Sequence, residues 1–148
     1  MDFTIVTPSF RQLEQLACCI ASIADQEGVR VEHIVQDGGT EGFEEFAKRM
    51  AKRWPDRPTY RRVMISGPDQ GMYDAINRGL KKAAGEICAY LNCDEQYLSG
   101  ALTTIWQRFQ DSPKTDIFLG DVVVVGAEER VVGRGARKQW EKRVCERE

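Results

Sequence analysis

Apolar and polar residues follow two different periods along the chain, and the period changes several times. A short apolar, β-branched run over residues 3–6 stops at Thr7-Pro8-Ser9, which predicts a buried strand that runs into a loop. Apolar residues then recur at helical spacing over residues 13–23, which predicts a helix of about four turns. The chain therefore begins with a strand followed by a helix.

The same alternation of strand and helix recurs further along the chain. The pattern predicts strands over residues 31–35, 60–66 and 86–91, helices over residues 42–54, 73–84 and 100–109, with Ser99 as the N-cap of the last helix, and final strand-like runs over 117–119 and 122–125. A parallel crossover needs about a dozen residues and most often uses a helix. We therefore expect an α/β fold, with a mostly parallel open sheet and helices on both faces.

The length and the change of character near the C-terminus suggest how the chain is organised. Its 148 residues, 42% of them hydrophobic, suit one packed domain, which we place at residues 1–126. Residues 127–148 are rich in charge and have almost no apolar periodicity. We expect this segment to be a charged C-terminal tail or a contact helix.

Charge and cysteine content exclude several classes of function. The 21 Lys and Arg residues and 23 Asp and Glu residues give a net charge of -2, which offers no electrostatic reason to bind nucleic acid or an anionic membrane. The five cysteines are odd in number and form no CxxC pair, which argues against a zinc site and a disulfide framework. With no apolar run of membrane-spanning length and no signal-like N-terminus, we expect a cytoplasmic protein.

Short polar or acidic groups follow each of the first four predicted strands. In an open parallel sheet, ligands bind beyond the carboxyl ends of the strands. Any one such cluster is more often an ordinary turn, but four clusters on one predicted edge favour a ligand site. The clusters are Thr7-Pro8-Ser9, Asp37-Gly38-Gly39, Pro68-Asp69-Gln70-Gly71 and Asn92-Cys93-Asp94-Glu95.

Two of these clusters suggest particular chemistry. Asp94, with Asn92 and Glu95, offers oxygen ligands that suit a hard divalent cation, although Asp94 as a simple loop cap is the alternative. Asp37 stands at a strand end beside two glycines, where it could accept hydrogen bonds from a ribose or a base. The two clusters together favour a nucleotide held through its phosphates.

The segment GPDQGMYDAINRGL combines a turn with an amphipathic helix. Gly79 stands where Ala would favour the helix by about 1 kcal/mol, so we expect close packing against another backbone there. Gly71 suits a turn with positive φ, and the N–H groups of the first helical turn could face a diphosphate. A surface ion pair between Asp74 and Arg78 is the alternative, or additional, role for these polar residues.

Four segments together resemble a known family. TIVTPSF, QDGGT, GPDQGMYDAINRGLKKAAGEI and AYLNCDEQYLSGAL resemble, in order and spacing over residues 3–125, the family 2 glycosyltransferases with the Rossmann-like GT-A fold. The resemblance implies an inverting, metal-dependent hexosyltransferase-like enzyme of polysaccharide or surface glycan biosynthesis. Its donor would be a UDP, GDP or dTDP sugar, its acceptor a glycan or lipid-linked molecule, and its cofactor Mg²⁺ or Mn²⁺.

The resemblance also assigns roles to residues. It implies a metal site at Asp94 and Asn92, and a donor site made by Thr7, Pro8, Ser9, Asp37, Gly38, Asp69, Gly71 and Asn77. The first position of the family's DxD motif is Asn92 here, which is a neutral oxygen donor. No segment resembles the half that carries the general base in the family, so the base is unassigned and Asp121 is a weak candidate, with a structural turn as its alternative role.

Other roles were weighed for the chain and for single residues. The second hypothesis is a truncated or non-catalytic module that binds nucleotide sugar and needs a partner subunit. Assembly of the chain with a partner subunit or as a homo-oligomer is open. A nucleotidyltransferase is the third, and the absence of a Gly-rich, Lys-containing loop after the first strand argues against it. His33 is expected to be a core histidine, and Cys93 a buried thiol with a raised pKa that is not a nucleophile.

Overall fold

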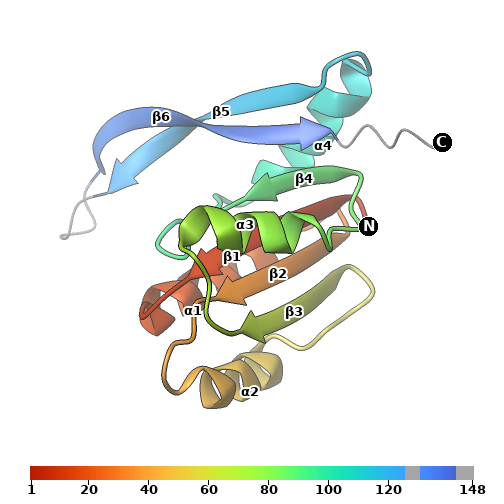
Figure 1. Cartoon of the computed structure of the whole chain (residues 1–148). Helices are drawn as coiled ribbons and strands as arrows, with labels where there is room; N and C mark the ends of the chain where they lie inside the picture. The colour runs from red at the N-terminus through yellow and green to blue at the C-terminus, as the bar shows by residue number, and fades with distance from the viewer. Residues whose placement is uncertain (126–130, 143–148) are drawn as a thin grey trace.

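The protein is built on one six-stranded sheet whose order is β3-β2-β1-β4-β6-β5 (Figure 1). The computed structural model describes residues 1–125 and, for residues 131–142, the course of the backbone. The strands are β1 (Phe3–Ser9), β2 (Val31–Asp37), β3 (Tyr60–Ser66), β4 (Ile87–Tyr90), β5 (Ile117–Val125) and β6 (Val131–Lys142).

The first four strands are parallel, with β1 between β2 and β4. Phe3 of β1 pairs with Val31 of β2 and with Ile87 of β4, so the three strands start level with one another. Strand β6 then runs antiparallel to β4 and to β5. The expected α/β fold with a mostly parallel sheet is confirmed.

Helices cover both faces of the parallel strands, as expected (Figure 1). On one face, α3 (Met72–Leu80) packs on β1 and β2. On the other face, α1 (Leu13–Ala24) and α4 (Ala101–Asp111) enclose a core of buried apolar residues, and α2 (Phe43–Arg53) packs on α1. That core includes Phe3, Ile5, Cys19, Ile23, Val31, Tyr60, Ile87, Leu102 and Phe109.

Gly79 of α3 shows why a glycine is needed inside this helix. A Cβ atom at Gly79 would overlap the Val6 side chain of β1, so the helix can lie close to the sheet only without it. The expected close packing is confirmed, although the neighbour is a side chain of the sheet and not a backbone.

Several helix and strand bounds differ from those expected. The predicted strand runs over 117–119 and 122–125 form a single strand, β5, with an irregularity between Gly120 and Val122. The N-cap of α4 is Gly100 in the left-handed conformation, not Ser99, because a residue with positive φ precedes the helix.

The C-terminal segment is the largest correction to the expected secondary structure. We expected a charged tail or contact helix over 127–148, but residues 131–142 form strand β6. Strand pairing with β4 and β5 supplies the backbone hydrogen bonds that this weakly patterned sequence does not predict by itself. Residues 127–130 and 143–148 lie outside the described residues. Within the described chain, no helix has both the length and the apolar character that crossing a bilayer requires.

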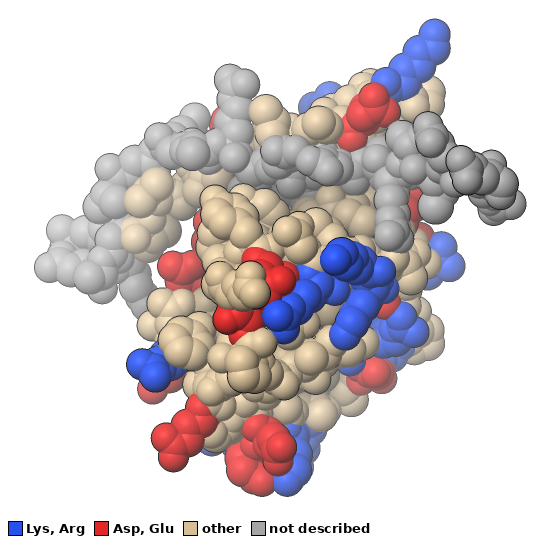
Figure 2. Space-filling model, in the orientation of Figure 1, with Lys and Arg blue, Asp and Glu red and all other residues tan. Residues whose placement is uncertain are grey.

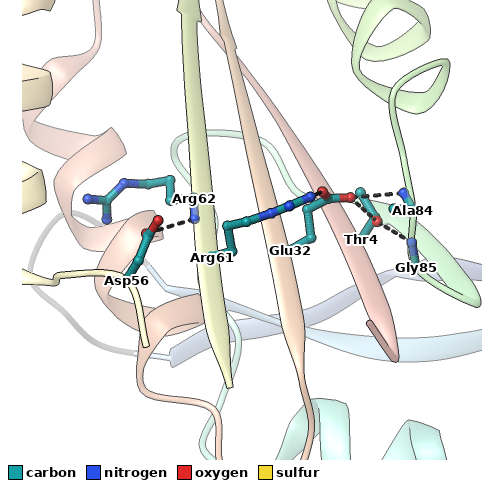
Figure 3. A network of polar contacts seen from close by, with 7 residues as sticks. All are labelled: Thr4, Glu32, Asp56, Arg61, Arg62, Ala84 and Gly85. Atoms are coloured by element: carbon teal, nitrogen blue, oxygen red, sulfur yellow. Dashed lines mark hydrogen bonds and ion pairs between the residues drawn. The ribbon is translucent and has the colours of Figure 1, made fainter. Parts of the chain in front are cut away.

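A buried carboxylate on β2 holds three segments together (Figure 3). Glu32 is 1% exposed and accepts hydrogen bonds from Thr4 Oγ1 (2.7 Å) and from the Ala84 N–H (2.9 Å), and it forms an ion pair with Arg61 of β3. Burial raises the pKa of Glu32, but the hydrogen bonds from Ala84, Arg61 and Thr4 outweigh burial and lower it. Glu32 therefore stays ionised and ties the turn before β4 to the sheet.

The single histidine lies in the core, as expected. His33 Nε2 lies 2.9 Å from Thr7 Oγ1, and His33 Nδ1 lies 3.3 Å from the Tyr60 hydroxyl. Complete burial, together with the nearby charge of Arg62, lowers the pKa of His33 from 6.5 to about 3. His33 is therefore neutral in the folded protein at neutral pH.

This depressed pKa makes stability depend on pH. Between pH 6.5 and 3 the unfolded chain binds a proton at His33 that the folded chain excludes. The stability that comes from keeping His33 neutral is therefore fully present above pH 6.5 and is lost as pH falls toward 3. We expect the free energy of unfolding, from urea titrations, to fall below pH 6.5 with a slope approaching about 1.4 kcal/mol per pH unit. His33→Gln should remove the slope between pH 7 and 5; an equally steep slope in that variant would contradict the assignment.

The packing of α3 on β1 gives a second prediction. Gly79→Ala should destabilise the protein by about 1–3 kcal/mol in urea unfolding, because overpacking against Val6 outweighs the gain in helix propensity. In a Val6→Ala background the added methyl group has room, so the same substitution should cost much less. Equal costs in both backgrounds would show that Val6 is not the obstacle.

Candidate functional site

An open cavity of about 570 Å³ lies where the parallel strands end. The segments after β1, β2, β3 and β4 all contribute to it, and the start of α3 forms part of one wall. Its lining residues are Pro8, Ser9, Phe10, Gln12, Gly38, Asp69, Gly71, Met72, Ala75, Asn92, Cys93 and Asp94. Seven of the ten residues expected to bind donor or metal are thus brought together: Pro8, Ser9, Gly38, Asp69, Gly71, Asn92 and Asp94.

The other expected residues lie elsewhere. Thr7 turns away from the cavity into the core, because successive side chains of a strand point to opposite faces, and its hydroxyl meets His33 and Cys19. Asn77 is exposed on α3, outside the cavity lining. Asp121 is an exposed residue of β5 at the irregularity after Gly120, and it too lies outside the lining, so the structure does not bring it to the cavity.

Asp37 is fully buried and engaged with its own loop. Its Oδ2 accepts hydrogen bonds from the Gly39 N–H (2.9 Å), the Thr40 N–H (2.7 Å) and the Ser66 hydroxyl (2.8 Å), while Oδ1 accepts one from Thr40 Oγ1 (2.6 Å). Asp37 is not among the residues that line the cavity. Its observed contacts shape the loop after β2 and join it to the end of β3.

The loop after β4 carries the expected cation ligands. Asn92 Oδ1 is buried and has no hydrogen-bond partner, while the exposed Asp94 carboxylate lines the same cavity. Glu95 instead accepts a hydrogen bond from the Asn92 N–H (3.0 Å), which shapes the loop. Among the described residues no three His, Cys, Asp or Glu side chains form a complete metal site. The oxygen donors that are present suit a hard cation that draws its remaining ligands from a bound molecule and water.

Cys93 lies between these two residues and behaves as expected. Its side chain is buried, and Sγ donates a hydrogen bond to Gln12 Oε1 (2.8 Å). Burial raises the pKa of the Cys93 thiol, and the neighbouring Asp94 carboxylate raises it further. The thiol is therefore protonated at neutral pH, which does not suit a nucleophile.

The loop that carries Asp69 is fastened to α3 by hydrogen bonds to two ion-paired residues of that helix. Asp74 accepts a hydrogen bond from the Gln70 N–H (3.0 Å) and pairs with Arg78 at 2.7 Å, while Arg78 also donates to the Pro68 carbonyl (2.9 Å). In Figure 2, acidic and basic side chains lie next to one another over the region of α3. The expected Asp74 to Arg78 pair is confirmed, and it holds the turn that precedes the helix.

The N–H groups just before α3 are already used. The Gly71 N–H donates to Asp69 Oδ1 (2.9 Å), and the Gln70 N–H donates to Asp74. Gly71 itself has φ 107°, which confirms the positive φ expected there. A bound anion would therefore have to meet N–H groups further into the helix.

Four lining residues lie outside the four polar clusters that the sequence indicated: Phe10, Gln12, Met72 and Ala75. Phe10 is 52% exposed and Met72 is 44% exposed, which is unusual for large apolar side chains and leaves surface for a ligand to cover. Phe10 follows Ser9 directly and Met72 follows Gly71 directly, and both Ser9 and Gly71 were expected at the site. Their positions next to these turns are the sequence feature that could have indicated Phe10 and Met72 as lining residues.

Comparison with known sequences identifies the family. Residues 4–147 match the profile described as Glycosyl transferase family 2. The chain belongs to glycosyl transferase family 2. It is 30% identical over 124 residues to a PGL/p-HBAD biosynthesis glycosyltransferase of Mycobacterium tuberculosis, covering 82% of this chain and 47% of that protein. It is also 30% identical over 105 residues to the Campylobacter jejuni GalNAc(5)-diNAcBac-PP-undecaprenol beta-1,3-glucosyltransferase, covering 71% of this chain and 33% of that protein.

Two solved structures that hold nucleotide sugars have the same fold. S. aureus TarS 1-349 in complex with UDP-GlcNAc superposes with a TM-score of 0.71 at 18% identity, over 90% of this chain and 37% of that one. The mannosyltransferase PcManGT from Pyrobaculum calidifontis, in complex with GDP-Man and Mn²⁺, gives a TM-score of 0.64 at 20% identity, over 78% of this chain and 34% of that one. The family 2 chain described here thus spans a third to about half of the relatives that it matches.

The Asp74 contacts give a prediction for this family 2 site. Asp74→Ala removes the acceptor of the Gln70 N–H and the partner of Arg78, so the amide hydrogen of Gln70 should exchange several-fold faster. Amide exchange followed by NMR measures this effect residue by residue. Asp111→Ala, at the exposed end of α4, is the matched control and should leave the rate unchanged. Unchanged exchange in Asp74→Ala would contradict the fastening role.

Proposed function

We propose that this chain forms the donor-binding part of a glycosyltransferase that transfers a sugar from a nucleotide-diphosphate sugar to an acceptor. One observation carries the proposal: the ends of four parallel strands meet at one cavity that combines Asp69 and Asp94 with the unpartnered, buried Asn92 Oδ1. Membership of glycosyl transferase family 2 supports the same reaction class.

The cavity residues divide the work of holding a donor. Ser9 lines the cavity, and its hydroxyl oxygen is buried in the cavity wall near Cys93. A Cβ at Gly38 would lie 3.0 Å from Phe10 Cδ2 and 3.2 Å from Asp69 Oδ2, so a larger residue there would crowd these two side chains. We assign the nucleoside to this side of the cavity, with Pro8, Ser9, Gly38, Asp69 and Gly71 around the donor. The ribose or base contact of Asp37, and donor-site roles for Thr7 and Asn77, stay sequence predictions.

Asp94 and Asn92 would hold a divalent cation, Mg²⁺ or Mn²⁺. When bound, such an ion supplies positive charge that offsets the diphosphate of the donor and of the leaving nucleotide. The carboxylate and amide oxygens suit either ion, and the structural neighbour with GDP-Man and Mn²⁺ supports the same class of cofactor. Asn92 in place of a carboxylate makes the site less negative, so the donor phosphates contribute more of the binding.

The transfer is proposed to be inverting, which requires a base that takes the proton of the attacking hydroxyl group. Asp69 and Asp94, the carboxylates that line the cavity, are assigned to the donor and the cation. Asp121 lies outside the lining and has little to support it as the base. A base contributed by further polypeptide is therefore the second form of the proposal: a nucleotide-sugar-binding module that a partner subunit, or another part of a longer chain, completes. The short span relative to known relatives favours it.

The relatives also suggest a setting for the reaction. The printed name of the Campylobacter jejuni relative describes a glucosyltransferase that acts on an undecaprenol diphosphate-linked saccharide. We propose a glycan or lipid-linked acceptor, a role in polysaccharide or surface glycan biosynthesis, and a cytoplasmic location.

Ligand-induced stabilisation tests the donor and cation sites together. UDP or GDP with Mn²⁺ should raise the thermal midpoint, with a stabilisation of about 2.7 kcal/mol at a hundredfold excess over Kd. Asp94→Ala should abolish the gain because it removes the carboxylate ligand, Asn92→Ala should reduce it, and Asn92→Asp should keep it. Asp121→Ala, outside the cavity, should respond as the unaltered protein does.

Turnover separates the two forms of the proposal. Release of nucleotide from the sugar nucleotide that stabilises the protein would show that the isolated chain is an enzyme. Binding without release, with any donor and acceptor, would favour the module that needs completion. A protein that no nucleoside diphosphate stabilises, with or without Mn²⁺, would overturn both.

A further inference from the structure

Arg11 adopts a backbone conformation that needs support. Its φ is 57°, and it is the one residue other than glycine with positive φ among the described residues. A side chain with a Cβ is strained in this left-handed region, and such strain persists only where surrounding contacts enforce it. Arg11 is the second residue after β1, and its neighbour Phe10 lines the cavity. The contacts that hold Arg11 therefore influence the wall of the donor site.

The side chain of Thr40 provides that support from the neighbouring loop. The Arg11 N–H donates a hydrogen bond to Thr40 Oγ1 (2.8 Å), and the Thr40 hydroxyl donates to Asp37 Oδ1 (2.6 Å). Asp37 is buried and anchored by the Gly39 N–H and the Ser66 hydroxyl. A continuous chain of hydrogen bonds thus leads from the end of β3, through Asp37 and Thr40, to the backbone of Arg11.

The side chain of Arg11 lies against Phe10. The Arg11 guanidinium carbon lies 4.7 Å from the centroid of the Phe10 ring, and the ring lies against Gly38. The Gly38 N–H also donates to the Ser9 carbonyl (2.8 Å), so the loops after β1 and β2 are joined on both sides of Phe10. Without the Thr40 bond, relaxation of Arg11 to negative φ would move the Phe10 ring.

We propose that Thr40 is a positioning residue of the donor cavity: its hydroxyl couples Asp37 to the Arg11 N–H and so holds Phe10 in the cavity wall. This inference rests on the proposed function for its effect on nucleotide binding. Thr40 itself is outside the cavity lining and acts through Arg11. It also gives Asp37 a role in the site that requires no contact with a ligand.

The hydroxyl group can be removed without a change of shape. Thr40→Val keeps the size and the N–H bond to Asp37 but cannot accept from Arg11 or donate to Asp37, whereas Thr40→Ser keeps both side-chain bonds. Two measurements are needed: exchange of the Arg11 amide hydrogen by NMR, and Kd for UDP and for GDP with Mn²⁺ by calorimetry. Urea unfolding verifies that each variant is folded under the conditions used.

In Thr40→Val, we expect exchange of the Arg11 amide and the Kd for the bound nucleotide each to rise by about tenfold, because the Arg11 N–H loses its acceptor and the link from Thr40 to Asp37 Oδ1 is broken. Thr40→Ser should restore both values, and amides within β1 should keep their protection in both variants. A Thr40→Val protein that binds nucleotide as the unaltered protein does, or loses affinity to the same extent as Thr40→Ser, would overturn the proposal. If the unaltered protein binds no nucleotide, the proposed function fails, while the Arg11 amide still reports whether the coupling exists.

Discussion

The position of β1 between β2 and β4 is the constraint on which the site depends. The parallel registers of β1 with both neighbours start level, so the strands deliver their following loops to one edge of the sheet. Close approach of α3, made possible by Gly79, then places the 68–71 turn beside the loop after β1. The cavity therefore follows from the strand order and from the small size of Gly79, and its formation does not depend on a ligand.

Buried or partly buried carboxylates hold the loops around this cavity. Glu32 ties the turn before β4, Asp37 shapes the loop after β2, and Asp74 fastens the turn before α3. Each accepts backbone N–H groups, which are strong partners for an ionised acid and would otherwise be left without acceptors. The acids thus form two groups: Glu32, Asp37 and Asp74, which lie outside the cavity lining, and Asp69 and Asp94, which line the cavity.

This division explains what the sequence could predict. The alternation of strand and helix was strong enough to give the fold class, and the rule for parallel sheets located seven of the expected ligand residues at one cavity. Sequence alone does not show which acid faces a ligand and which faces a backbone N–H, so the contacts of Asp37 could not be foreseen. Strand alternation turns the Thr7 side chain toward the core, which a list of loop residues does not show, and β6 was missed because its strand pairing is long-range.

The loop after β4 has a further implication for how the site works. Asn92 and Asp94 supply a neutral and a charged oxygen donor, and among the described residues no third carboxylate, histidine or cysteine completes a metal site with them. A divalent cation normally takes about six or more oxygen ligands, so most of them would come from water and from the diphosphate. Cation and nucleotide should therefore bind together better than either binds alone, because each provides ligands or charge that the other needs. Under the proposed function, such coupling would make the incomplete cation site part of donor recognition, because an ion that the protein alone holds weakly would be held tightly once a diphosphate is present.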